Sequence, residues 1–392
     1  MNQLSITQYL LNIIRSVLNR SDFPSPQDAQ IDFEALYSFS KAHHLAGLVA
    51  LCPNIIKQMP PELAKKFIYE NNRATAREAT QEVVISAFLD KMEEAGLRAM
   101  PLKGFCIKHF YPHPALRYMT DTDIFVDEDA IEKITPILNS LGFTFDHETT
   151  YEIIYKSTQL VIELHKTLVQ DVTKTLYSYY GNGWKFGQKK EGKEFIYEMP
   201  LDDLYVYTIS HIAKHYAQGG IGIMHIADIF VLNRAALDRD SISGKLAKLN
   251  LEKFEDNIRK LAEMWFSLAP SSKLDDTVKE MAAFILKSGA YGTTENRSVA
   301  KINLFSKTNP FATKWKIILH KIFPRPETIK LLFPATKKYP ALYPCFIVIR
   351  WIKILFFRTS DIKKIAVTAE VSDAQVNAFE EHLKRMGIPK EL

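Results

Sequence analysis

A short β-rich segment lies between two long helical stretches, and this alternation constrains the fold more than any other feature of the chain. Residues 1 to about 95 place apolar residues three and four positions apart, as in NRATAREATQEVVISAFLDKMEEAG, which is typical of amphipathic helices. After Gly96 the pattern changes to short β-rich segments, namely LRAMPL, DTDIFV, FTFDHE, YEIIYK and QLVIELH. One helical segment, EDAIEKITPILNSLG, interrupts them, and Gly142 can end it. The sequence therefore predicts an α+β protein, with a small mixed sheet flanked by N-terminal and C-terminal helical lobes.

The changes of period divide the chain into four predicted regions. We expect an N-terminal helical region at 1–95, an α/β core at 96–198, a helical lobe closing over the core at 199–290 and a mainly helical region at 291–392. Residues 288–312 gather Gly, Ser, Thr and Asn without a sustained period. This composition predicts a loop or a boundary between lobes.

The composition argues against two broad classes of protein, although RNA stays a possible partner. Of the 392 residues, 47% are hydrophobic and 24% are charged, which is too apolar for a disordered chain. Lys and Arg number 50 against 45 Asp and Glu, and a net charge of +5 is too small for a dedicated nucleic-acid binder. This balance permits a polyanionic ligand without requiring one. The chain also lacks an RNA-recognition motif, so no motif supports RNA as a partner.

The cysteines and the N-terminus indicate a cytoplasmic protein. Cys52, Cys106 and Cys345 lie far apart and form no CxxC motif, which argues against both a disulfide framework and a zinc cluster. The first residues, MNQLSITQYLLNIIRSVLNR, lack the basic start, long apolar stretch and cleavage site of a signal peptide. We therefore expect a reducing, cytoplasmic location.

The most apolar segment of the chain is ALYPCFIVIRWIKILFF at residues 341–357. Pro344, Arg350 and Lys353 interrupt it, and its length lies at the lower limit for crossing a bilayer. We predict a buried or lobe-packing helix and no transmembrane span. The alternative is a weak in-plane membrane contact, with the basic residues toward lipid headgroups and Trp351 at the boundary.

Two carboxylates separated by one residue begin the predicted strand DTDIFV. In a strand, residues i and i+2 face the same side, so Asp121 and Asp123 project together and repel each other. A divalent cation between them makes the arrangement favourable, and hard oxygen ligands suit Mg²⁺. The alternative reading is a D-x-D pair that only caps a turn at the start of a strand.

The strand QLVIELH offers a third carboxylate, Glu163. If this strand pairs beside DTDIFV, Glu163 joins Asp121 and Asp123, and three carboxylates on two strands make a two-metal site conceivable. Two plainer interpretations stay open. Glu163 can be a solvent-facing strand residue, and His165 can be a hydrogen-bonded imidazole in the core.

The segment PLKGFCIKHFY predicts a phosphate site before these carboxylates. PLKG ends a strand and FCIKHFY begins a helix, with Gly104 at the turn where the backbone can approach a ligand closely. The free N–H groups at a helix N-terminus attract anions, and Lys103 adds a full positive charge. Arg117, just before DTDIFV, can supply a planar guanidinium to the same phosphates.

Together these residues resemble the nucleotidyltransferase superfamily with the polymerase-β-type fold, and most closely its largely uncharacterised bacterial branch. The matching motifs are Leu102-Lys103-Gly104, Arg117, Asp121-x-Asp123 and Glu163-Leu164-His165, and the resemblance covers about residues 30–235. It implies transfer of a nucleoside monophosphate from an NTP to an acceptor that it does not name: a small molecule, an RNA end or a protein side chain. It also implies Mg²⁺ or Mn²⁺ as cofactor, as two ions held by Asp121, Asp123 and Glu163. Better-known members have Gly-Ser or Gly-Gly in place of Lys103-Gly104, so a serine contact to the γ-phosphate is missing here.

A histidine-rich helix follows the β-rich segment. His211 and His215 in HIAKH lie one helical turn apart, but the glutamate of H-E-x-x-H is absent, which excludes a zinc protease of that type. The bacterial branch carries a similar helix followed by an aspartate, matched here by Lys214, His215 and Asp228, and this implies that they bind the nucleotide. Asp228 lies on a mainly apolar helix and needs a partner, for which Lys214 or His215 is the candidate.

Two functions of different class are compatible with these residues. One is an active nucleotidyltransferase, and the other is a non-catalytic relative that binds a nucleotide or a partner. The intact Asp121, Asp123 and Glu163 favour the first, since a decayed site would lose at least one of them.

Overall fold

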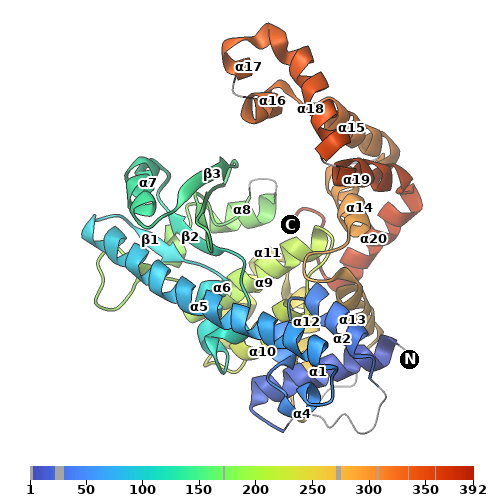
Figure 1. Ribbon diagram of the computed structural model, residues 1–392. Coiled ribbons are helices and arrows are strands. Elements are labelled where there is room, and N and C mark those ends of the chain that lie inside the picture. The colour runs from blue at the N-terminus through green and yellow to red at the C-terminus, as the bar shows by residue number, and fades with distance from the viewer. Residues whose placement is uncertain are drawn as a thin grey trace.

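The fold is the predicted α+β arrangement, a five-stranded mixed sheet with helices around it (Figure 1). The computed structural model describes residues 3–22, 31–170, 173–270, 275–306, 309–333, 335–357 and 359–392. Among these residues, no helix has both the length and the apolar character needed to cross a bilayer. The division into four regions stays a prediction.

The N-terminal part is helical, as its period predicts. Its helices are α1 (Gln3–Asn19), α2 (Phe33–Ala42), α3 (Ala46–Val49), α4 (Pro53–Ile56) and α5 (Pro61–Glu94). The 34-residue helix α5 runs from the N-terminal helices to the sheet (Figure 1). Its last turns bury Ile85, Phe88 and Met92 in the core beneath the sheet.

The sheet forms where the period of two predicts it. Its strands are β1 (Ala99–Pro101), β2 (Thr122–Val126), β3 (Thr144–Glu148), β4 (Glu152–Lys156) and β5 (Val161–His165), in the order β1-β2-β5-β4-β3. Only β2 and β5 pair in parallel. The connecting elements are α6 (Gly104–Ile107), η2 (Lys108–Phe110), η3 (Pro114–Leu116), η4 (Glu128–Ala130) and α7 (Ile131–Ser140). A second small ladder, β6 (Gln188–Lys189) with β7 (Tyr197–Glu198), follows α8 (Lys174–Tyr180) and η5 (Trp184–Phe186).

The two faces of the sheet have different neighbours. Ile124 and Val126 of β2 lie in one core with α5 and α7. The alternate residue Phe125 belongs to the other core, which includes the helices that follow the sheet. Because Asp123 shares the side of β2 with Phe125, its carboxylate points toward those helices rather than toward α5.

The helices after the sheet supply the opposite wall. They are α9 (Leu201–Ala217), α10 (Ile223–Leu232), α11 (Arg239–Leu249), α12 (Glu252–Phe266) and α13 (Asp276–Ser288). Helix α9 buries ten of its 17 residues, so it is apolar on nearly all sides. The chain ends in α14 (Thr294–Phe305), α15 (Pro310–Ile322), α16 (Pro326–Leu332), α17 (Ala335–Lys338), η6 (Pro340–Leu342), α18 (Tyr343–Phe357), α19 (Thr359–Glu370) and α20 (Asp373–Met386).

The prediction of a loop at residues 288–312 is wrong over most of this segment. The helix α14 occupies Thr294–Phe305, and α15 begins at Pro310. Thr293 caps α14 by accepting a hydrogen bond from the backbone N–H of Asn296. Polar residues that indicate a loop in the sequence are buried in this helix, where the Ser298 hydroxyl lies 3.1 Å from that of Thr368. Tertiary contacts with α19 and α20 therefore outweigh the weak local helix signal.

The helix predicted to be buried at residues 341–357 is largely exposed. It is α18, and it packs on α16 and α19, so the lobe-packing part of the prediction holds. Ile354 is buried, but Val348, Ile352 and Phe356 expose 59%, 49% and 75% of their surface. Contacts cover only one side of this helix, and its composition does not reveal that.

A buried ion pair joins the segment before β2 to α10. Arg117 donates from Nε and Nη2 to the two carboxylate oxygens of Asp228, each at 2.8 Å, and the Tyr111 hydroxyl donates to the same carboxylate at 2.7 Å. Only 2% of the Asp228 side chain is exposed. The expected partners, Lys214 and His215, do not contact it, and the guanidinium predicted to face phosphates is occupied in this pair.

Gly104 leaves room for the side chain of Arg117 in this pair. A Cβ at Gly104 would lie 2.2 Å from Nη1 of Arg117 and 2.6 Å from Sδ of Met119. Its own φ is negative, so the reason for glycine here is the space beside Arg117. The helix that begins at Gly104 is also shorter than predicted, one turn of α-helix followed by one 3₁₀ turn.

We predict that Asp228→Ala lowers the free energy of unfolding by about 3–5 kcal/mol, because it leaves the Arg117 guanidinium buried without its counter-charge. Urea denaturation measures this difference. The matched control is Asp276→Ala, which removes an exposed Asp276–Lys279 pair and should change stability by about 0.5 kcal/mol or less. Equal losses in the two variants would show that the buried pair does not hold the two parts together.

Candidate active site

Three acidic residues meet on one side of the central strands. In the parallel β2–β5 ladder Asp123 lies opposite Glu163, as expected from the order of the strands. In the antiparallel β4–β5 ladder Ile154 lies opposite Glu163, and Glu152 lies opposite His165. Residues two apart in a strand share a face, so Glu152 and Glu163 join Asp123 on the side away from α5.

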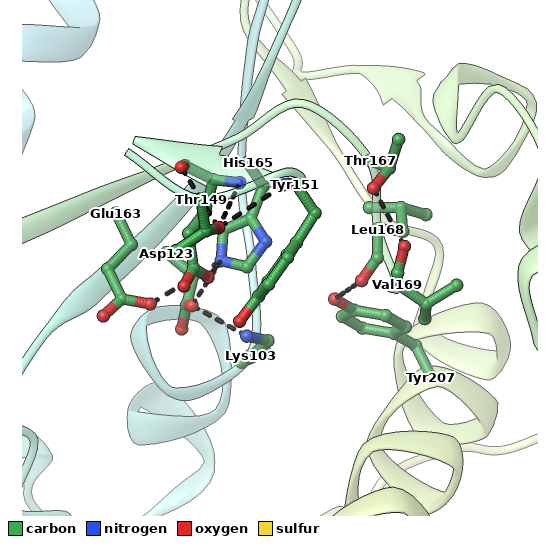
Figure 2. A network of polar contacts seen from close by, with 11 residues as sticks. Lys103, Asp123, Thr149, Tyr151, Glu163, His165, Thr167, Leu168, Val169 and Tyr207 are labelled. Atoms are coloured by element: carbon green, nitrogen blue, oxygen red, sulfur yellow. Dashed lines mark hydrogen bonds and ion pairs between the residues drawn. The ribbon is translucent and has the colours of Figure 1, made fainter. Parts of the chain in front are cut away.

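Asp123 is held by two side chains (Figure 2). Its Oδ1 accepts from Nζ of Lys103 at 2.7 Å and lies 2.7 Å from Nε2 of His165. Burial by itself raises the pKa of Asp123, but Lys103 and His165 outweigh burial and hold that pKa well below its usual value. Asp123 is therefore ionised although it is buried.

Lys103 has an unusual backbone. It lies at the turn between β1 and α6 with φ +49° and ψ −123°, a conformation that residues other than glycine rarely adopt. Strain of this kind is found mainly where surrounding contacts fix a functional side chain. Here it places the ammonium group against Asp123.

Asp121 and Glu163, the other two carboxylates predicted to bind metal, have no positive neighbours that outweigh the effect of burial on their pKa values. Burial raises the pKa of Asp121, and the negative charge of Asp123 raises it further. Burial, followed by the charges of Asp123, Asp121 and Glu152, raises the pKa of Glu163 to about 8. A cation bound among these groups would relieve this repulsion.

The tightest group of potential ligands differs from the predicted one. Asp123, Glu163 and His165 each offer an atom within 4.8 Å of the others, whereas Asp121 lies outside this group. His165 is less suited to ligation than the carboxylates. A metal-bound histidine normally donates a hydrogen bond from its second nitrogen, and Nδ1 of His165 is buried without a partner. We interpret His165 as a group that orients Asp123.

A cavity of about 510 Å³ opens between the sheet and α9 and α10. All ten residues singled out from the sequence line it: Lys103, Gly104, Arg117, Asp121, Asp123, Glu163, His165, Lys214, His215 and Asp228. The carboxylates lie on the sheet side, and Lys214 and His215 come from α9. Its volume is in the range of sites that hold a small molecule.

Lys214 is a half-buried cation that faces this cavity. Among the described residues it has no hydrogen-bond or ion-pair partner, and burial together with Lys103 lowers its pKa to about 8. Burial also lowers the pKa of His211 and of His215, so both imidazoles are neutral. A half-buried ammonium without a partner favours an anionic ligand.

Sequence reasoning missed several residues of the cavity wall. Glu152 is the clearest, and its position two residues before Ile154 in YEIIYK could have placed it on the face of Glu163. At the other end, His44 stacks on Tyr118 with ring centroids 5.5 Å apart, and Tyr291 meets His44 edge-on. These three rings come from distant segments, so no local pattern in the sequence links them.

The comparisons with known proteins identify the family. The family described as "Uncharacterised nucleotidyltransferase" matches residues 29–267, which is more than half of the chain. The comparisons with curated proteins and with solved structures found no match to this chain. The match includes the sheet, α9 and α10, and with them all ten predicted site residues. The chain therefore belongs to this family of nucleotidyltransferases.

Proposed function

We propose that the chain transfers a nucleoside monophosphate from an NTP to an acceptor hydroxyl with the help of Mg²⁺ or Mn²⁺. The observation that carries this proposal is the register of the parallel β2–β5 pair. It sets Asp123 beside Glu163 at the wall of a cavity that also contains Asp121 and an unpaired lysine. Family membership makes nucleotidyl transfer the reaction class.

The donor set fits a hard divalent ion. Carboxylate oxygens are the ligands that Mg²⁺ prefers, and the raised pKa values of Asp121 and Glu163 report negative charge that a cation would offset. We assign Asp121, Asp123 and Glu163 as the residues that hold two ions. Bound divalent ions would neutralise phosphate charge and increase the acidity of the acceptor hydroxyl.

The protein's own groups bind and orient the nucleotide. Lys214 faces the cavity without a counter-charge and is the first candidate for a phosphate contact. Lys103 neutralises Asp123 in this structure and lies at the same wall, so it can serve the same phosphates. Arg117 acts indirectly, because its pair with Asp228 fixes α10 against the turn at Gly104.

The proposal is tested with each NTP labelled at the α-phosphate. The protein is incubated with Mg²⁺ or Mn²⁺, first alone and then with cell extract, and label is sought in protein, RNA and small molecules. Label in one of these fractions supports transfer and identifies the acceptor class. Tight nucleotide binding without any transfer would instead support the non-catalytic relative.

We predict that Asp121→Asn and Asp123→Asn both abolish transfer but change the stability of the metal-free protein in opposite directions. Asp121→Asn removes a repelled charge, so stability should hold or rise. Asp123→Asn removes the counter-charge of Lys103 and should lower stability by about 1–3 kcal/mol. Thermal unfolding in EDTA measures both. A fall of the same size in both variants would contradict the assigned electrostatics.

We predict that Glu163→Gln lowers turnover by roughly two to four orders of magnitude and leaves the affinity for NTP·Mg²⁺ within a few-fold. The reason is that Glu163 lies on β5 opposite Asp123 of β2, where we expect it to position the acceptor side of the site. Calorimetry and single-turnover kinetics separate the two quantities. Glu148→Gln, on the exposed strand β3, is the matched control and should change neither. Unchanged turnover in Glu163→Gln would show that Glu163 is a strand residue without a role in transfer.

A further inference from the structure

The C-terminal part of the chain contains an arm, which we define as residues 310–357. It consists of α15, α16, α17, η6 and α18, and it extends from the body beyond α14 and α19, away from the sheet (Figure 1). Helix α15 packs on α14, α19 and α20, and α18 packs on α19, so these helices anchor the arm. The arm lies outside residues 29–267, which match the family, and it does not line the cavity.

Large apolar side chains are exposed at helical spacing along the arm. On α15 and just after it they recur every four residues: Phe311 (55% exposed), Trp315 (45%), Leu319 (54%) and Phe323 (57%). On α18 they recur every three or four residues: Val348 (59%), Ile349 (40%), Ile352 (49%) and Phe356 (75%). Each helix thus presents an apolar stripe that the described part of the chain leaves uncovered. Exposed stripes of this kind mark surfaces that bind a partner.

The arm is also the basic part of the chain. It carries nine Lys and Arg against one Glu, whereas the other 344 residues carry 41 Lys and Arg against 44 Asp and Glu. Within the described residues, none of its exposed basic side chains forms an ion pair with a carboxylate: Lys316, Arg325, Lys330, Lys338 and Lys353. The positive charge of the arm is therefore available to an anionic partner.

Apolar stripes and unpaired cations together indicate one kind of partner. A second copy of the arm would bring two strongly positive segments together, and such association is opposed by repulsion. Nucleic acid would use the cations but would give no burial to aliphatic residues such as Val348 and Ile352. An anionic lipid surface satisfies both features, because apolar side chains enter the acyl boundary while Lys and Arg meet lipid phosphates.

We propose that the arm docks in the plane of an anionic membrane. The apolar stripes of α15 and α18 insert at the boundary between headgroups and acyl chains, and the exposed basic side chains of the arm contact the headgroups. Aromatic residues in the arm suit this depth, since Trp315 and Tyr339 are exposed. The ammonium group of Lys338 lies over the Tyr339 ring, 5.5 Å from its centroid. This inference is independent of the proposed reaction.

The test is co-sedimentation of the full chain with vesicles of phosphatidylcholine alone or with about one-third phosphatidylglycerol. We expect binding to the anionic vesicles at least about tenfold stronger than to the neutral ones, and weaker at high salt. Ile352→Glu with Phe356→Glu should lower the partition coefficient at least about tenfold by removing apolar insertion. Lys316→Glu with Lys353→Glu should lower it to a similar extent by removing charge.

The matched control places the same new charges on the body. Tyr69→Glu with Val83→Glu changes two exposed residues of α5 and should leave vesicle binding unchanged. Thermal unfolding and NTP binding should be unaltered in all three double variants, because the substituted residues are exposed and lie outside the cavity.

Three results would overturn the proposal. One is equal or absent binding to both kinds of vesicle. Another is concentration-dependent dimerisation in sedimentation velocity that Ile352→Glu with Phe356→Glu abolishes, which would assign the stripes to a second copy. The third is tight binding to single-stranded RNA that is lost with Lys316→Glu and Lys353→Glu but kept with Ile352→Glu and Phe356→Glu, which would assign the arm to nucleic acid.

Discussion

Repulsion among buried carboxylates is the constraint on which the site depends. The pairing of β2 with β5 and of β5 with β4 forces Asp123, Glu163 and Glu152 onto one side of the sheet, with Asp121 at the entrance to β2. Lys103 and His165 both contact Asp123. The pKa values of Asp121 and Glu163 stay raised, because burial and the charges of neighbouring carboxylates outweigh the positive charge of Lys103. Because uncompensated buried charge costs stability, this arrangement is compatible with the cation site that we propose.

The same reasoning separates the positive groups into two roles. Arg117 is occupied by Asp228, so its charge stabilises the contact between the segment before β2 and α10, and the small size of Gly104 makes room for it. Lys214 has no such partner and faces the cavity. We therefore expect lysines of the cavity wall to attract the phosphates of the proposed substrate, whereas Arg117 stabilises the geometry of that wall.

Sequence patterns predicted those features that depend on local period. The strands and the helices α5, α7 and α9 follow from residues close together in the sequence. The meeting of Asp123 with Glu163 was expected only on the assumption that their strands pair, and the β2–β5 ladder confirms that assumption. The partner of Asp228 could not be found in this way, because Arg117 lies 111 positions away in the sequence. Lys214 and His215 lie nearer in the sequence, but only an arginine can donate two parallel hydrogen bonds to one carboxylate. Helix α14 and the exposed side of α18 were missed for a related reason, since both depend on which neighbours cover them.

Charge is distributed unevenly between the arm and the rest of the chain, which contains the site. A nucleotide-binding site gains from positive potential, yet the 344 residues outside the arm carry a slight excess of acidic over basic side chains. Basic excess in this chain is concentrated instead in residues 310–357, beside exposed apolar stripes that a free nucleotide could not cover. Attraction of the NTP alone would not explain why basic residues gather in the arm beside exposed apolar side chains. The arm is therefore better explained by a large anionic and apolar surface than by the substrate of the cavity, and the two parts of the chain serve separate contacts.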